Sequence, residues 1–556
     1  MNQWLQRATD LRQAERWQEL LVYSLQWTEK DPKEAKAWHN LGMARVHLGF
    51  PDEAVDAFQR VTEILPDKPA AWVNLGNILA TMERYPEAIA AYRQAVELDP
   101  GKADYWHVLG KSYFAMDRDG EAAATFQKAL ECEPENWDIW LSFGGALNLL
   151  GRQAEAESAF RKSLELNPGY GLAWYLLGVA CRLQGHQQEA IDALREALRI
   201  APESFKALME LGCAYKELGL KSQALEAYRL AVNLQPDDAN ALRSLGTAYG
   251  DLGRYPEAID ACQQALKHNA EHAGALLELA GLHIAATHYE KALEVTMRAV
   301  EIDPNDARVW HELGAVQFHR KKYEEAAAAN QHALEIDPDY GDAWYNLGAT
   351  YESMDMPAEA AKALEQATRC NPEDACHWEK LGEMHGKLER YQEAVEAYRQ
   401  ALRIEPDNAG AWNELAIVYS ALEMHSEARD AFRRAVRIDP EMECAWYNLG
   451  SLYNHLKRSD AAIDAYQQAL KVNPFNVESW VGLGVANGTI GLYSEAIVSF
   501  ENGLKYDPYN PSLHYNLGRV HVLSGNKIKA MEFVNNLFSI DSELAKSLQD
   551  EIDDID

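Results

Sequence analysis

The chain has 556 residues, with 86 acidic and 53 basic side chains, a formal net charge of −33 at pH 7 and a hydrophobic content of 47%. This acidic balance argues against a nucleic-acid-binding protein, because phosphate contacts need clustered Lys and Arg, and against adsorption to anionic lipid. The hydrophobic content excludes a chain that is disordered throughout.

Neither a membrane span nor a secretory signal is visible in the sequence. The longest stretches without a charged residue, 166–181 and 479–494, are 16 residues long, which is too short to cross a bilayer. The first residues carry charges throughout and include no apolar core of a signal peptide. The seven cysteines form no CxxC pair, which favours a reducing compartment. We therefore predict a cytoplasmic protein without membrane insertion.

Proline recurs with a period of 34 residues along almost the whole chain, at positions 32, 66, 100, 134, 168, 202, 236, 304, 338, 372, 406, 440, 474 and 508. The gap between residues 236 and 304 spans two periods, and Ala270 occupies the missing place. If this proline is position 32 of a repeat, residues 1–544 divide into 16 repeats of 34 residues, with 12 residues left over. A fixed period of this length indicates a repeat architecture.

Other columns keep the same register. Position 4 of the repeat is Trp in twelve repeats, position 8 is Gly in thirteen, position 20 is Ala in fifteen, and position 24 is usually large and apolar. Gly inside a helix costs about 1 kcal/mol relative to Ala, so its recurrence needs a steric reason. We predict that positions 8 and 20 mark a close approach of two helices and that the Trp at position 4 fills the gap between neighbouring repeats.

The apolar residues within one repeat predict two helices. In residues 341–374 they recur at helical intervals in two groups: Trp344, Leu347, Gly348 and Tyr351, followed by Ala360, Leu364 and Ala367. The proline at position 32 ends the second helix, because it lacks the backbone N–H and clashes with the preceding turn. Each repeat is therefore predicted to form one helical hairpin, which buries its apolar face only by stacking on its neighbours.

These columns match the tetratricopeptide-repeat pattern W-x2-L-G-x2-Y…A-x3-F…P, for example in WYNLGSLY…AAIDAY…NP of the fourteenth repeat. The chain resembles the tetratricopeptide-repeat superfamily, and in particular the long repeat arrays of O-linked N-acetylglucosamine transferases, without a catalytic domain. The resemblance implies an all-α fold: a right-handed superhelical solenoid of about 16 hairpins, with the first helix of each repeat lining the concave face.

The two ends of the array depart from the pattern. We predict a divergent N-terminal capping repeat over 1–34, fourteen regular repeats over 35–510, a divergent last repeat over 511–544, and an acidic cap or tail over 545–556. Ser542 replaces the proline and is predicted to cap a further helix at its N-terminus. An apolar stripe is predicted to cover the last hairpin, and the acidic residues to face water: Leu544, Leu548, Ile552 and Ile555 for the stripe, and Asp550, Glu551, Asp553, Asp554 and Asp556 for the acidic set.

No catalytic, cofactor-binding or metal site is expected. Residues 268–272 spell the zinc-peptidase motif H-x-x-E-H, but they occupy positions 30–34, where the second helix normally ends, whereas the motif needs both histidines on one helix face. Gly110-Lys111-Ser112 resembles the end of a phosphate-binding loop but falls within a predicted helix. Because repeats and caps account for every residue, we predict that the chain is not an enzyme and needs no cofactor.

Residues of the first helix that escape the core are the candidate binding sites, since this is where the family binds peptides. Position 6 holds asparagines whose amides could clamp a peptide backbone: Asn40, Asn74, Asn346, Asn448 and Asn516. An apolar strip is predicted in repeats four to six: Val108, Phe114, Leu141, Leu149, Leu172, Tyr175, Leu176, Val179 and Leu183. Tyrosines precede three of the asparagines and could act as anchors: Tyr345, Tyr447 and Tyr515.

The predicted function is a non-enzymatic scaffold or adaptor that binds extended peptides or amphipathic helices of one or more protein partners along the concave groove. The alternative is a substrate-recruiting subunit that works with a separate glycosyltransferase or another modifying enzyme. We expect two contact zones, a hydrophobic one in repeats four to six and a polar one in repeats eleven and fourteen. Replacing Leu172, Tyr175 and Leu176 by Ser is expected to weaken binding without disturbing the core.

Overall fold

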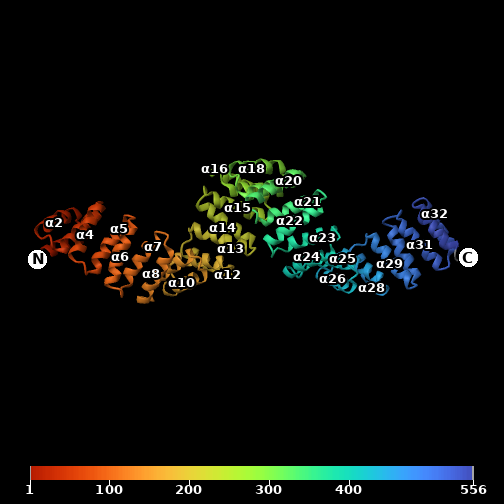
Figure 1. The fold of residues 1–556 in the computed structure, drawn as a ribbon, viewed down its shortest axis with the longest axis horizontal. Helices are drawn as coiled ribbons and strands as arrows, with labels where there is room; N and C mark the ends of the chain where they lie inside the picture. Colours follow the sequence, from red (N-terminus) through yellow and green to blue (C-terminus); the bar gives the residue numbers. More distant parts are fainter. Residues whose placement is uncertain (1, 554–556) are drawn as a thin grey trace. The chain divides into compact units, whose positions relative to one another are not determined.

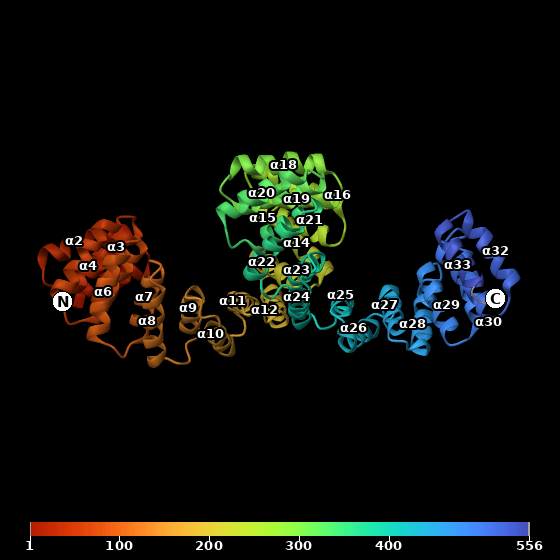
Figure 2. The ribbon, with the colours of Figure 1, turned by 45° about the vertical axis from the view of Figure 1, so that its right-hand side comes forward.

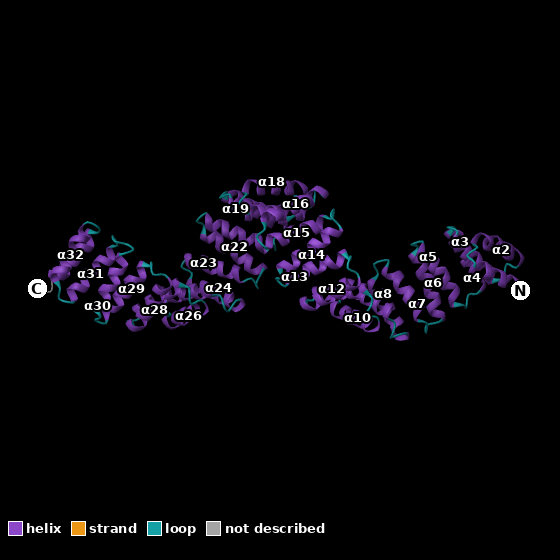
Figure 3. Cartoon of the chain, turned by 180° about the vertical axis from the view of Figure 1, so that it is seen from behind, coloured by secondary structure: helices purple, strands orange, loops and turns teal. Residues whose placement is uncertain are grey.

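The structure, a computed structural model, describes residues 2–553, and within that range it contains 33 helices and no strand (Figure 3). The first helix of each repeat spans positions 1–13 in most repeats: α1 (Asn2–Gln13), α3 (Ala35–His47), α5 (Pro69–Thr81), α7 (Ala103–Phe114), α9 (Trp137–Leu149), α11 (Gly171–Leu183), α13 (Phe205–Glu217), α15 (Ala239–Asp251), α17 (Ala273–Ala285), α19 (Ala307–His319), α21 (Gly341–Ser353), α23 (Ala375–Lys387), α25 (Ala409–Ala421), α27 (Glu443–His455), α29 (Val477–Thr489) and α31 (Pro511–Leu523).

The second helix spans positions 17–30 in most repeats: α2 (Trp17–Lys30), α4 (Pro51–Ile64), α6 (Tyr85–Leu98), α8 (Asp119–Cys132), α10 (Gln153–Leu166), α12 (Gln187–Ile200), α14 (Lys221–Leu234), α16 (Tyr255–His268), α18 (Tyr289–Ile302), α20 (Tyr323–Ile336), α22 (Pro357–Cys370), α24 (Tyr391–Ile404), α26 (His425–Ile438), α28 (Ser459–Val472), α30 (Tyr493–Leu504) and α32 (Lys527–Phe538). A last helix, α33 (Ser542–Asp553), follows the sixteenth hairpin. The predicted all-α array of hairpins is confirmed.

The chain divides into two compact units, residues 1–282 and 283–556. Within each unit consecutive helices pack in chain order, so that the second helix of one repeat also contacts the first helix of the next, as α6, α7 and α8 show (Figures 1 and 2). The boundary falls within α17, in the repeat that has Leu276 in place of the position-4 Trp and Ala280 in place of the Gly. No helix among the described residues is both long and apolar enough to cross a membrane.

The glycine column is explained by the side chain at position 24. A Cβ atom on Gly144 would lie 2.6 Å from the ring of Phe160, and one on Gly76 would lie 2.5 Å from the ring of Tyr92. Both rings are almost completely buried. The close approach predicted at position 8 therefore exists, and the side chain at position 24 of the second helix fills it. In three repeats the added Cβ atom would also lie 3.2–3.4 Å from the carbonyl oxygen of the position-20 alanine.

The tryptophans at position 4 have a more specific role than filling a gap. In eleven repeats the indole Nε1 donates a hydrogen bond of 2.7–3.0 Å to the carbonyl of the proline six residues earlier: Trp38, Trp72, Trp106, Trp140, Trp174, Trp310, Trp344, Trp378, Trp412, Trp446 and Trp480. In the last repeat His514 donates from Nε2 to Pro508 in the same way, at 2.8 Å. The Pro and Trp columns thus recur together because each pair fixes the connection between two repeats.

The turn inside every hairpin uses a left-handed residue at position 15. Gly fills this position in seven repeats, with φ between 72° and 82°, and other residues fill it in nine, with φ between 54° and 60°. Left-handed backbone costs a residue with a Cβ about 1–2 kcal/mol, and a β-branched residue is the worst case. Thr287, with φ of 60°, is the β-branched residue in this column.

Replacing Thr287 by Gly is expected to raise the free energy of unfolding by about 1 kcal/mol, because Gly adopts this conformation without strain, although it gains some entropy in the unfolded chain. Local hydrogen exchange of α18 measures the effect. The reverse substitution, Gly491→Thr, places a β-branched residue at a φ of 82° and is expected to destabilise α30. Equal stability of both variants and the parent chain would show that the turn is not strained.

The C-terminal helix covers the last hairpin as predicted, since Leu548 and Ile552 are buried against α31 and α32. Two details differ from the prediction. The carboxylate of Asp541, rather than Ser542, accepts hydrogen bonds from the first backbone N–H groups of α33, at 3.0 and 3.1 Å. Glu551 does not simply face water, because it accepts a hydrogen bond from Tyr515. The predictions for Asp554, Ile555 and Asp556 lie outside the described residues.

Candidate functional site

Three of the five asparagines at position 6 of the first helices connect neighbouring repeats. Nδ2 of Asn74 lies 3.5 Å from Nδ1 of His39, and Nδ2 of Asn346 lies 3.4 Å from Nδ1 of His311. In each pair the partner is position 5 of the preceding repeat. Burial lowers the pKa of both histidines, so that their rings are neutral at pH 7 and can accept from the amide. One donor of each of these amides is therefore used inside the protein.

The other asparagines of the column are engaged as well. Asn448 donates from Nδ2 to Oδ1 of Asn413 at 3.1 Å, and Asn413 donates to Glu414 at 3.0 Å. Asn40 and Asn516 each donate to the backbone carbonyl four residues earlier in their own helix, at 2.8 Å. Asn40 is buried, with 5% of its surface exposed, which corrects its prediction as a surface contact.

The apolar strip of repeats four to six is only partly a surface. Leu141 is 8% exposed and belongs to the core, which corrects its prediction as a groove residue. Val108 and Phe114 are half-buried against the core of repeats two to five. Leu149, Leu172 and Leu183 are 59%, 48% and 52% exposed. The exposed part of the strip is thus formed by three leucines on the adjacent helices α9 and α11.

The remaining members of the strip, Tyr175, Leu176 and Val179, are half-buried. Tyr175 and Leu176 pack against the core of repeats five to eight, so serine at these positions is expected to destabilise the fold. The predicted triple substitution would therefore confuse binding with folding. Of the three residues, only Leu172 is exposed enough for its substitution to test a surface contact without disturbing the core.

An ion cluster follows the apolar strip on the next repeat. The guanidinium of Arg182 on α11 contacts Glu210 at 2.9 Å and Glu217 at 2.7 Å, both on α13. Burial, followed by the charge of Glu210, raises the pKa of the neighbouring Tyr175. Beside the exposed leucines, the first helices therefore carry a half-buried arginine that is paired with two glutamates, and not an unpaired charge.

The polar zone predicted in repeat eleven contains Tyr345 beside a second ion cluster. The hydroxyl of Tyr345 lies 3.3 Å from Sγ of Cys376, and its ring stacks on His377 with the centroids 4.9 Å apart. Lys380 and Lys387 on α23 bridge Glu352 on α21 and Glu383 on α23, with four N–O distances of 2.6–2.9 Å. Although burial opposes it, these lysines lower the pKa of Glu383 to about 2.

The zone predicted in repeat fourteen is hollowed. A cavity of about 470 Å³ between α25 and α27 is lined by Asn448 and by residues that the sequence pattern did not single out, among them Ile417, His425 and His455. Ile417 is 40% exposed, and the rings of His425 and His455 lie 5.3 Å apart. Tyr447, beside Asn448, packs near Tyr466 with the centroids 6.0 Å apart.

Tyr515 in the last repeat is occupied by the chain itself. Its hydroxyl donates to Glu551 on α33 at 2.6 Å, and Arg519 contacts the same carboxylate at 3.2 Å. The C-terminal helix therefore takes the place that the prediction reserved for a partner at Tyr515. Tyr515 is engaged because the capping helix α33 makes a polar contact, through Glu551, at the edge of its apolar stripe.

One arrangement on α7 and α9 resembles a catalytic triad without its geometry. Oγ of Ser142 lies 3.1 Å from Nε2 of His107, and Asp138 lies 3.8 Å from the same nitrogen. A triad carboxylate orients the ring through the opposite nitrogen, Nδ1. Asp138 instead contacts Lys111 at 3.2 Å. His107 and Ser142 thus form another connection between position 5 of one repeat and position 6 of the next.

Glu157, Cys181 and Glu189 are the described residues that lie close enough together to share a metal ion. The guanidinium of Arg161 already contacts both carboxylates. Burial and the charge of Glu157 raise the pKa of the Cys181 thiol to about 11, so it is protonated at pH 7, whereas a metal ligand must be the thiolate. His268 and His272 of the H-x-x-E-H motif contact Asp237 and Asn240, respectively.

The comparisons with known proteins agree with this repeat geometry. A family model described as the cilia and flagella-associated protein 70 C-terminal domain matches residues 69–278 and 271–445, which together make up more than half of the chain. Two models described as tetratricopeptide repeat match residues 33–100 and 444–476. The chain belongs to the tetratricopeptide-repeat superfamily. Tetratricopeptide repeats are interaction modules, and the chain is a repeat scaffold of this kind.

Solved tetratricopeptide-repeat structures are similar to parts of the chain. A tetratricopeptide repeat protein from Parabacteroides merdae is 20% identical, with coverage of 45% of this chain and 98% of that chain and a TM-score of 0.41. YrrB, described as a TPR protein with an unusual peptide-binding site, is 26% identical, with coverage of 34% and 99% and a TM-score of 0.31. The APC/C hetero-tetramer Cut9-Hcn1 is 16% identical, with coverage of 81% and 96% and a TM-score of 0.37. Among curated proteins, none matches the chain.

Proposed function

We propose that this tetratricopeptide-repeat scaffold binds peptide or helical segments of partner proteins on the exposed faces of its first helices. The observation that carries the proposal is the apolar side of α9 and α11. Leu149, Leu172 and Leu183 are each about half exposed or more there, and Tyr175, Leu176 and Val179, between the two ends of α11, are half-buried. Exposed apolar side chains that gather on neighbouring elements mark interaction surfaces, whereas isolated ones do not. An amphipathic helix or an apolar peptide suits such a surface.

The polar zone supports a different kind of contact. Asn448 and the cavity between α25 and α27 combine an amide, two serines, two histidines and the exposed Ile417. The asparagine amide keeps a carbonyl oxygen and a second N–H for a ligand, because its hydrogen bond to Asn413 uses one donor. We expect a backbone-reading contact here, weaker than the apolar one, on the order of 1 kcal/mol for each hydrogen bond lost.

The test of the apolar zone is a double substitution, Leu172→Ser with Leu183→Ser, used in affinity capture from the native cell followed by titration of the recombinant partner. Burying the exposed half of each leucine stabilises a complex by about 1 kcal/mol, so the pair is expected to raise the Kd roughly 10- to 100-fold. The matched control is Leu230→Ser on α14, a second helix, where the leucine is 43% exposed.

Circular dichroism of both variants checks the fold, and little change is expected because all three side chains lie at the surface. Partners that bind the double variant as well as the parent chain but lose affinity for Leu230→Ser would contradict the proposal. Capture of a modifying enzyme through the same leucines would instead support recruitment of substrates to that enzyme.

A further inference from the structure

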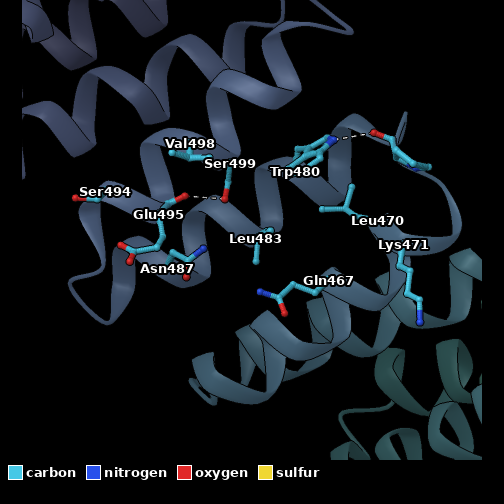
Figure 4. A pocket seen from close by; sticks show the side chains of 11 residues that line it. Gln467, Leu470, Lys471, Trp480, Leu483, Asn487, Ser494, Glu495, Val498 and Ser499 are labelled. Atoms are coloured by element: carbon cyan, nitrogen blue, oxygen red, sulfur yellow. Dashed lines mark hydrogen bonds between the residues drawn. The ribbon is translucent and has the colours of Figure 1, made fainter.

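A cavity of about 710 Å³ lies between α28 of repeat fourteen and the helices α29 and α30 of repeat fifteen, away from the zones described above. Its walls include Leu470, Trp480, Leu483 and Val498, and its polar groups include Gln467 and Asn487. Figure 4 shows Gln467 and Asn487 on either side of Leu483, and Trp480 held by its 2.8 Å hydrogen bond to the carbonyl of Pro474. The cavity is therefore walled by the buried Leu470 and Leu483, the half-buried Trp480 and the exposed Val498.

In six of the sixteen repeats the equivalent place, position 11 of the first helix, holds a tyrosine of the chain itself. At position 11 the hydroxyl of Tyr351 accepts a hydrogen bond of 2.8 Å from Nε2 of Gln331, which is position 25 of the preceding repeat. Arginines at position 25 make the same bond in three further pairs, at 2.8–3.1 Å: Arg93 to Tyr113, Arg195 to Tyr215, and Arg399 to Tyr419. In these four repeats a phenol ring bonded to position 25 is thus the filling of this place.

Repeat fifteen lacks this filling. Asn487 occupies position 11, and Gln467 occupies position 25 with no side-chain hydrogen bond to any described residue. The corresponding cavities that contain Tyr351 and Tyr249 measure about 580 and 450 Å³, smaller than the one at Asn487. The cavity at Asn487 is thus the largest of these three and carries a glutamine donor of the same kind as Gln331.

The loops next to the cavity are also exceptional. Position 33 is polar or Gly in every repeat except repeats fourteen and fifteen, where it is Phe475, directly after Pro474, and Tyr509. These rings are 70% and 75% exposed, and Phe475 packs on Tyr506 with the centroids 5.2 Å apart. Lys471 lines the cavity and has no carboxylate within ion-pair distance among the described residues. The rim thus offers exposed aromatic surface and the positive charge of Lys471, while the carboxylate of Glu495 lines another part of the cavity.

We propose that this cavity binds a tyrosine side chain of a partner protein, carried on a segment with an acidic residue beside the tyrosine. The ring occupies the place of the missing position-11 tyrosine, and the phenol oxygen accepts a hydrogen bond from Nε2 of Gln467. The acidic residue pairs with Lys471, and the flanking backbone packs on Phe475. This site is separate from the surface of the first helices and does not depend on the function proposed for them.

The test uses the full chain and three synthetic acidic pentapeptides that differ only in a central Tyr, Phe or Leu, with binding followed by ligand-observed NMR. The tyrosine peptide is expected to bind about fivefold more tightly than the phenylalanine peptide, because the hydroxyl adds one hydrogen bond. The variant Asn487→Tyr fills the cavity with the chain's own ring and is expected to reduce binding at least tenfold. The matched variant Tyr351→Asn opens the equivalent place beside Gln331 and is expected to create a second site.

A further variant, Gln467→Leu, changes an exposed position and separates binding from folding. It is expected to abolish the preference for Tyr over Phe while retaining binding of both. Equal binding of the three peptides to the parent chain would overturn the proposal, as would undiminished binding to Asn487→Tyr. If Asn487→Tyr misfolds, the Gln467→Leu variant is still decisive, because an unchanged preference for the tyrosine peptide would by itself overturn the proposal.

Discussion

Replacing Gly144 by valine is expected to lower the local free energy of unfolding of α9 and α10 by about 3 kcal/mol. A Cβ atom at this position would lie 2.6 Å from the ring of Phe160, which is fully buried and cannot move into solvent. Overpacking of a well-filled core costs about 1–3 kcal/mol, and the two branches of valine add to the clash. The better helix propensity of valine offsets only a few tenths of a kcal/mol.

The neighbouring Gly145 provides the control in the same helix. A Cβ atom there would meet only the ring of Phe114, at the ordinary contact distance of 3.9 Å. Gly145→Val is therefore expected to change the local stability by less than about 0.5 kcal/mol. Hydrogen exchange of α9 and α10 in the full chain is the suitable measurement, because repeats unfold locally rather than all together. Equal effects of the two substitutions would show that the glycine column has no packing role.

Acidification is expected to weaken the contact between α7 and α9 through His107. Burial, together with the charge of Lys111, lowers the pKa of His107 to about 4, although Asp138 and Asp104 act in the opposite direction. Between its ordinary pKa of 6.5 and this value, the unfolded chain binds the proton and the folded chain does not. The stability that the neutral ring contributes is therefore complete above pH 6.5 and is lost as the pH falls toward 4.

The expected loss between pH 7.5 and pH 4.5 is about 2 kcal/mol, since one pKa unit corresponds to about 1.4 kcal/mol. The variant His107→Asn keeps a polar group at position 5, as Asn413 does naturally, but cannot titrate. Its α7–α9 hydrogen exchange, corrected for the intrinsic pH dependence, is expected to change by about 2 kcal/mol less than that of the parent chain. An identical pH dependence of the two proteins would assign the titration to other groups.

The regular part of the fold was predictable because one pattern is repeated 16 times. The spacing around Trp344 and Ala360 places α21 and α22 within a few residues of their observed ends. What the pattern could not give is the direction of individual side chains. Leu141 shares its column with half-buried residues such as Tyr345, yet it is itself buried and belongs to the core of repeats five to eight.

The candidate site was harder to predict because its polar side chains form hydrogen bonds with one another between neighbouring repeats. Asn346 and Asn448 were identified from their column, but their partners His311 and Asn413 lie 35 residues away and come into contact only when repeats stack. Asn487 was not predicted as a site residue. Position 11 is Tyr in six repeats, and a comparison of this position with position 25 of the preceding repeat could have identified Asn487.

The central claim, that partners bind to the exposed faces of the first helices, is tested most directly by photo-crosslinking in the native cell. A benzophenone side chain replaces Leu172 or Leu183 on α11 in one pair of variants and Leu230 on α14 in a control variant, all at exposed positions of the same compact unit. We expect the α11 variants to crosslink the same partner and the α14 variant to crosslink none. A partner that crosslinks to position 230 but not to position 172 or 183 would contradict the claim.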